Sequence, residues 1–296
     1  MGKMQMPKQS HFRKKSLVFS SIVLAISIPL GVWAGAATDG TMNQANPGQI
    51  DNFSGDFTVP DTIGTTAGNN LFHSFSTFNI DAGESATFTG PAAINNVITR
   101  VTGTDPTNTS TFNGPLTSQI PTANFYFMNP NGIIFKEGAT ISVDGSFYAT
   151  TSDRIMLGNE MFNANPNLDP PGQLLTAPPS AFGFLDSNPN AIVLEGTQLV
   201  KYSPDAEAFF GIESTLDIPD GASFSLIGGN IVLDEATTPA DVLVGTENGT
   251  GSFISATGNR VALVSVASTG DVTMDANGYG LTSFDTLGDI ELKGES

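Results

Sequence analysis

Beyond residue 40 the sequence repeats a short alternating apolar segment that is bounded by glycine, asparagine or aspartate. Alternation of apolar and polar residues over about four to eight positions is typical of a strand with one buried face. The spacing of three and four that an amphipathic helix requires is not sustained in this part of the sequence. We therefore expect an all-β fold. The segments are residues 139–145, 191–196, 222–228, 230–234, 259–263, 271–274 and 289–294.

These segments favour a parallel β-helix, or β-solenoid, because no obvious two-residue hairpin loop joins them. In a solenoid each coil stacks on the previous one, so that the inward apolar side chains form continuous ladders. An antiparallel sandwich or barrel has similar strand spacing and is the alternative. Residues 104–121 and 158–190 lack the repeating unit and are rich in Pro, Asn, Thr and Gly, so we expect loops or excursions outside the solenoid there.

Residues 1–36 have the pattern of a secretory signal peptide. Five basic residues precede residue 16, an uncharged apolar run covers 17–32, and Ala34 and Ala36 supply the small-x-small pattern that signal peptidase accepts. The run of about 16 residues is shorter than the roughly 20 that a spanning helix needs, and no later run is long enough. We expect cleavage after Ala36, a mature chain of 37–296 and no stable membrane span.

Charge excludes one class of partner. The chain has 11 Lys and Arg against 29 Asp and Glu, a formal net charge of −18, and five of the basic residues lie in the leader. A surface this acidic repels phosphate backbones, so nucleic-acid binding is not expected.

The residues available for catalysis or metal binding are few. The chain has no cysteine and two histidines, His11 in the leader and His73 in an apolar patch. Without a second histidine in the mature chain, we expect His73 to be a hydrogen-bonded structural residue, with no metal site and no cofactor. Asp153 and Arg154 would suit a secreted β-helix polysaccharide lyase or hydrolase, the alternative function, but six basic residues in 37–296 are too few for a clustered site. We therefore do not expect an enzyme.

The sequence Asn129-Pro130-Asn131-Gly132 predicts a tight turn. Proline fixes φ at one turn position, and asparagine and glycine both adopt positive φ readily. The turn is followed at once by Ile133-Ile134-Phe135, which predicts that it directs the chain into a buried strand.

This turn and its flanks resemble the secretion domain of filamentous-haemagglutinin-type exoproteins, the passengers of bacterial two-partner secretion. The resemblance covers about residues 44–270 and implies a right-handed parallel β-helix with extra-helical loops and hairpins, in agreement with the strand pattern. The matching blocks are residues 123–135 with 138–151 after them, 69–75, 97–103, 179–185 and 259–270.

The resemblance implies recognition rather than catalysis. The periplasmic domains of a dedicated outer-membrane barrel transporter would bind the domain unfolded or extended, after Sec export. The domain would then fold outside and template the coils of an adhesin-like passenger, released or at the cell surface. Asn129, Pro130, Asn131 and Gly132 are the expected transporter contact, and a purely structural turn is the alternative. We expect 37–296 to be the N-terminal part of a longer passenger, whose remaining part binds a host or surface ligand.

One motif departs from the family pattern. The best-studied branch of the family has an Asn-Pro-Asn-Leu motif upstream of the Asn-Pro-Asn-Gly motif. Here Asn165-Pro166-Asn167-Leu168 lies downstream, inside a proline-rich loop, and we interpret it as a coincidence of composition.

Overall fold

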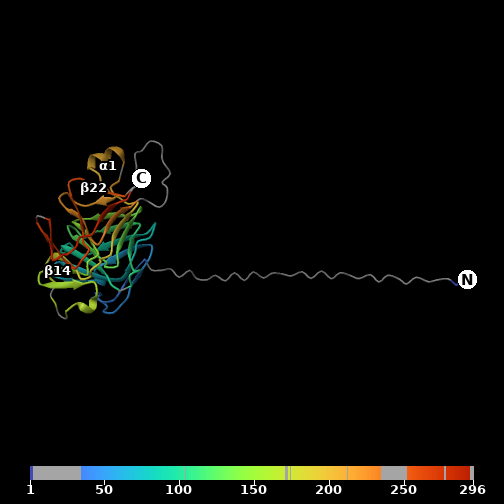
Figure 1. Ribbon diagram of the computed structural model, residues 1–296, viewed down its shortest axis with the longest axis horizontal. Coiled ribbons are helices and arrows are strands. Elements are labelled where there is room, and N and C mark those ends of the chain that lie inside the picture. Colours follow the sequence, from blue (N-terminus) through green and yellow to red (C-terminus); the bar gives the residue numbers. More distant parts are fainter. Residues whose placement is uncertain are drawn as a thin grey trace. The chain divides into compact units, whose positions relative to one another are not determined.

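The computed structural model describes residues 1–2, 35–103, 105–170, 173, 175–211, 213–234, 252–276 and 278–293. Strands dominate this part of the chain, and the expected all-β class is confirmed (Figure 1).

Three sheets with parallel pairing form the body of the fold. Sheet A contains β5 (Asn70–Phe78), β7 (Asn96–Val101), β10 (Asn124–Met128), β13 (Phe147–Thr150), β20 (Ser223–Gly228) and β23 (Arg260–Ser265). Sheet B contains β3 (Asp56–Pro60), β6 (Ser85–Thr89), β9 (Pro115–Ser118), β12 (Thr140–Val143) and β19 (Leu216–Asp217). Sheet C contains β8 (Ser110–Phe112), β11 (Ile133–Lys136), β17 (Ile192–Glu195), β21 (Ile231–Asp234) and β26 (Ile290–Leu292).

The chain visits these sheets in a repeating order. From β7 in sheet A it passes through β8 in sheet C and β9 in sheet B before it returns to sheet A as β10, and β11, β12 and β13 repeat the circuit. Each returning strand pairs in parallel with the strand of the previous circuit. Parallel stacking of this kind disagrees with an antiparallel sandwich and agrees with stacked coils. The right hand of the coil stays a prediction.

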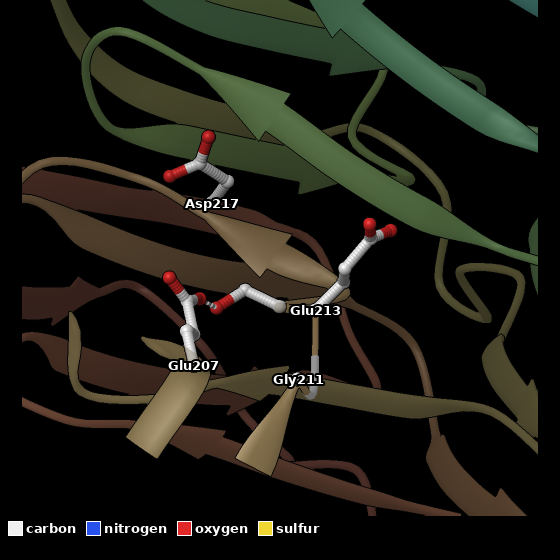
Figure 2. Close-up of a pocket in the computed structure, with 5 residues that line it drawn as sticks. Glu207, Gly211, Glu213 and Asp217 are labelled. Carbon is white, nitrogen blue, oxygen red and sulfur yellow. Dashed lines mark hydrogen bonds between the residues drawn. The ribbon is translucent and has the colours of Figure 1, made fainter. Parts of the chain in front are cut away.

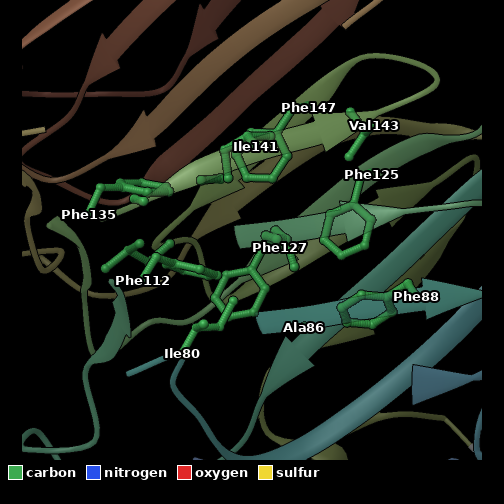
Figure 3. Close-up of a cluster of buried hydrophobic side chains, with 14 of the residues drawn as sticks. Ile80, Ala86, Phe88, Phe112, Phe125, Phe127, Phe135, Ile141, Val143 and Phe147 are labelled. Carbon is green, nitrogen blue, oxygen red and sulfur yellow. The ribbon is translucent and has the colours of Figure 1, made fainter. Parts of the chain in front are cut away.

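Ladders of aromatic side chains fill the interior between the three sheets (Figure 3). Phe125, Phe147 and Phe224 follow one another in register along sheet A, with ring centroids 6.0 and 5.5 Å apart. In sheet C the rings of Phe112 and Phe135 stack at 5.1 Å. One coil cannot bury both faces of such a ring, so each coil depends on its neighbours for its core.

The first strands protect an edge of sheet A. β1 (Ala36–Thr38) and β4 (Thr65–Ala67) pair antiparallel with β5, and β2 (Asn52–Phe53) pairs antiparallel with β1. An unpaired strand edge is a template for association with other chains, and these strands cover the one at β5. A 3₁₀ turn, η1 (Asp61–Ile63), follows β3.

A fourth sheet, which is antiparallel, packs on the outer face of sheet A. It contains β14 (Arg154–Leu157), β15 (Glu160–Asn163), β16 (Pro179–Phe184), β24 (Gly270–Asp275) and β25 (Gly278–Thr282), and the 3₁₀ turn η2 (Pro166–Leu168) follows β15. Its apolar side chains form a separate core with Phe72, Ile98 and Tyr126 of sheet A. The excursion expected at 158–190 is therefore present, but the segment 271–274, expected as a coil strand, belongs to this antiparallel sheet.

The expectation for residues 104–121 was wrong. This segment contains β8 and β9, and Phe112 and Leu116 are fully buried in the coil core.

A short helix, α1 (Pro204–Phe210), interrupts the strands between β18 (Gln198–Lys201) and β19, and β18 pairs with β22 (Phe253–Ala256). Ser203 caps the helix through its side chain, and Gly211 ends it in the left-handed conformation.

Candidate functional site

The Asn129–Gly132 turn joins sheet A to sheet C at one corner of a coil. The Oδ1 atom of Asn129 accepts a hydrogen bond from the backbone N–H of Asn131 at 2.9 Å, and Gly132 adopts a φ of 112°. Both features close the chain into the predicted tight turn, which directs it into β11. The structural part of the prediction is confirmed, and a role in transporter contact stays a prediction.

The Asn129 side chain is fully buried. Its Nδ2 group donates to the carbonyl oxygen of Asn108 and to Oγ of Ser110, both at 2.9 Å. All the hydrogen-bonding capacity of this amide faces the protein, so in the folded domain it is out of reach of a partner.

The next two residues of the turn lie nearer the surface. Pro130 and Asn131 are half-buried. The Nδ2 group of Asn131 donates to the carbonyl of Gly103 at 3.2 Å, and the carbonyl of Pro130 accepts from Nδ2 of Asn190 at 2.8 Å. The turn is thus attached to the coils on both sides.

The Asn165–Leu168 segment forms the same local turn in a different setting. Oδ1 of Asn165 accepts from the backbone N–H of Asn167 at 3.1 Å, and Leu168 is 56% exposed. It follows β15 of the antiparallel sheet and does not lead into a coil strand. The shared geometry comes from the shared Asn-Pro-Asn sequence.

A buried cation next to this segment was missed from the sequence. Arg100 on β7 is fully buried, and its Nη1 group donates to the carbonyl of Asn163 at 2.5 Å and to Oδ2 of Asp169 at 2.6 Å. Its guanidinium lies 4.3 Å from the ring centre of Phe162. These contacts attach the excursion to sheet A.

An asparagine ladder along one corner was also missed. Nδ2 of Asn96 donates to Oδ1 of Asn70 at 2.8 Å, and Nδ2 of Asn124 donates to Oδ1 of Asn96 at 3.2 Å. Residues in register on β5, β7 and β10 make these contacts, so the repeat is visible in the sequence only once the register is known.

The family model of the TPS secretion domain, where TPS stands for two-partner secretion, matches residues 34–293. The match covers the three parallel sheets, the antiparallel sheet and the Asn129–Gly132 turn. The chain belongs to the TPS secretion domain family. Comparison with curated proteins finds no match.

As a member of this family, the chain is part of a two-partner secretion exoprotein. Such an exoprotein is exported through an outer-membrane transporter. The family is not a known enzyme family. Among the residues that the structure describes, no helix is both long enough and apolar enough to cross a membrane.

His73 lies in the interior of the TPS domain, in contact with the rings of Phe75 and Phe88. The expected hydrogen bond is absent, because neither ring nitrogen has a partner among the described residues. Burial without a partner lowers the pKa of His73 to about 3, so the imidazole is neutral.

Asp153 and Arg154 make separate structural contacts. Oδ2 of Asp153 accepts from the backbone N–H of Leu185 at 2.6 Å, and burial raises the pKa of this carboxyl. Arg154 pairs with Asp271 at 3.3 Å. Within the described residues no group of three or more His, Cys, Asp or Glu side chains could hold a metal ion.

An acidic cavity lies beside α1 and bears on the alternative function, a polysaccharide lyase or hydrolase (Figure 2). Its volume is about 370 Å³, and Glu207, Glu213 and Asp217 line it together with Gly211 and Ser214. The Glu207 carboxylate accepts a hydrogen bond from Ser214, which ties the helix to the following loop. A structural contact therefore accounts for this carboxylate, and none of the described residues that line the cavity is basic.

The predicted cleavage point lies at the beginning of the TPS domain. Ala34 is outside the described residues, whereas Ala36 is fully buried and pairs with Phe53 and Phe78. Cleavage after Ala36 stays a prediction, and it would remove a buried residue of β1 from the fold.

Proposed function

We propose that residues 37–296 are the secretion and folding-nucleation domain of an adhesin-like bacterial exoprotein, released or displayed at the cell surface. In this proposal the chain reaches the periplasm through Sec with residues 1–36 as a cleaved signal peptide. The outer-membrane transporter then binds the segment Asn129–Gly132, and the stacked coils form a right-handed parallel β-helix outside the cell. Any host or surface ligand is bound by a passenger region other than these residues.

The burial of Asn129 supports this proposal most directly. In the unfolded chain its amide is free to donate and accept, whereas in the folded domain the amide is committed to Asn108, Ser110 and Asn131. A transporter that binds this amide must therefore do so before the corner of the coil forms. Folding outside the cell then removes the contact, which gives export a direction.

The stacking of the coils supports folding nucleation. Within the described residues, β23 ends sheet A and β26 ends sheet C. Exposed apolar side chains lie on these strands, among them Val261 at 39%, Ile290 at 48% and Leu292 at 77%. A further coil that pairs with these edges would bury them, as each described coil buries the one before it.

The test is transporter-dependent export of the chain 1–296. We expect the protein in the medium or on the surface of cells that carry the partner transporter, and in the periplasm of cells from which the transporter gene is deleted. Equal amounts outside both strains would contradict the proposal.

A further inference from the structure

Residues 188–194 repeat the sequence of the turn and strand at 129–135. Asn129-Pro-Asn-Gly-Ile-Ile-Phe135 and Asn188-Pro-Asn-Ala-Ile-Val-Leu194 are identical at four of seven positions. The remaining three positions pair glycine with alanine, isoleucine with valine, and phenylalanine with leucine.

The fold places these two segments side by side. β11 and β17 pair in parallel with Ile133 opposite Ile192 and Phe135 opposite Leu194, so the two turns before them stack in register at one corner. Nδ2 of Asn190 donates to the carbonyl of Pro130 at 2.8 Å, a direct contact between the turns.

The corner does not require this sequence. In the coil before, the chain enters β8 through Thr107, Asn108 and Thr109, and in the coil after it enters β21 through Gly229 and Asn230. Neither neighbour has an Asn-Pro pair at these positions, although both strands join the same sheet in register. Turn formation at this corner therefore does not explain why two successive coils both carry Asn-Pro-Asn there.

The equivalent asparagines also differ in their surroundings. Asn129 is fully buried with three hydrogen bonds, whereas Asn188 is exposed and its side chain makes no hydrogen bond to any residue that the structure describes. The fold accounts for Asn129 and leaves the identity of Asn188 without a structural reason.

We propose that residues 188–194 are a second transporter-binding segment, recognised in the unfolded chain through the features that they share with 129–135. This inference rests on the proposed function of the first segment. The two copies begin 59 residues apart, which in a flexible chain is a separation of about 40 Å. Two linked weak contacts at such a separation strengthen each other through an effective concentration of roughly millimolar order.

The experiment compares Asn188→Ala with two other variants of the full chain, in cells with and without the transporter. Asn129→Ala tests the first segment, and Ser187→Ala is the matched control, since Ser187 is the exposed neighbour of Asn188. Secreted and periplasmic amounts are measured, together with the denaturant midpoint of each purified chain and the affinity of each urea-unfolded chain for the purified periplasmic domains of the transporter.

We expect Asn188→Ala to weaken binding about five-fold, the factor that one side-chain hydrogen bond contributes, and to reduce secretion with an unchanged midpoint. Ser187→Ala should match the wild type in all assays. Wild-type secretion and binding of Asn188→Ala would overturn the inference, and so would a loss of secretion in proportion to a lowered midpoint. Reduced export of Asn129→Ala in the same experiment would still support the proposed function. Export that is unchanged when the transporter gene is deleted would contradict the proposed function itself.

Discussion

Arg100 and Asp169 form an ion pair across 2.6 Å, in which the arginine side chain is fully buried and the aspartate side chain is 14% exposed. The pair joins β7 of the coil to the end of the η2 turn, 69 residues later in the chain. Arg100 also donates from Nε to Oγ of Ser74 at 2.8 Å. The excursion is therefore attached to sheet A through a charged group that has no access to water.

Removal of the aspartate charge tests this attachment. Asp169→Asn leaves a buried guanidinium without a counter-ion, so we expect the free energy of unfolding to fall by about 3–5 kcal/mol. The control is Glu195→Gln, which breaks the partly exposed pair with Lys136 and should cost no more than about 1 kcal/mol. Urea unfolding of both variants provides the comparison, and equal losses would show that Arg100 does not depend on its partner.

His73 makes stability depend on pH in a defined direction. Its pKa is about 3 in the folded domain and 6.5 as the ordinary value, so below pH 6.5 the unfolded chain binds a proton that the folded domain does not. Stability from this residue is present above pH 6.5 and is lost as the pH falls toward 3, with a slope approaching about 1.4 kcal/mol per pH unit.

Replacement by phenylalanine removes this titration, because the aromatic interior around Phe75 and Phe88 accepts a similar ring. We expect the stability advantage of His73→Phe over the wild type to increase between pH 7 and pH 5 in urea unfolding. Parallel stability curves for the two chains would show that His73 is not buried in its neutral form.

The two faces of β11 should respond differently to truncation. Phe135 is fully buried and stacks on Phe112, so Phe135→Ala should lower the free energy of unfolding by about 3–5 kcal/mol. Ile134 is half-buried on the opposite face of the strand, and Ile134→Ala should cost much less. Similar losses measured for both variants would contradict the register of β11.

The beginning of the mature chain affects stability as well as export. The carbonyl of Gly35 accepts from the backbone N–H of Asn79 at 2.5 Å, and Ala36 is fully buried. We expect a chain that begins at Gly35 to be about 1–2 kcal/mol more stable than one that begins at Ala37, from one hydrogen bond and one buried methyl group. Thermal melting of the two chains measures this difference.

N-terminal sequencing of the exported protein tests the cleavage itself. A start at Ala37 is predicted, and retention of Met1 in a membrane fraction would contradict it.

Much of the fold follows from sequence because each alternating segment carries its own evidence. The segments around Ile141, Ile192, Phe224, Ile231 and Val261 are strands of the parallel sheets, since alternation and flanking turn residues are local properties. β8 and β9 were missed because their few apolar residues, Phe112 and Leu116, lie among threonines, serines and a proline.

Features that depend on register could not be predicted. The Asn70–Asn96–Asn124 ladder and the hydrogen bond from Asn190 to the carbonyl of Pro130 join residues whose alignment is set by the lengths of the intervening loops. The burial of Arg100 depends in the same way on an excursion that returns to sheet A from far along the chain. The turn at Asn129 was predictable because its geometry is contained within four residues.

The central claim is that the transporter binds the Asn129–Gly132 segment before the domain folds. The most direct measurement compares the binding of folded and urea-unfolded chains to the purified periplasmic domains of the transporter, at the same final urea concentration. We expect the unfolded chain to bind and the folded domain to bind far more weakly, because folding buries the Asn129 amide. Equal affinity of the two forms would contradict the account.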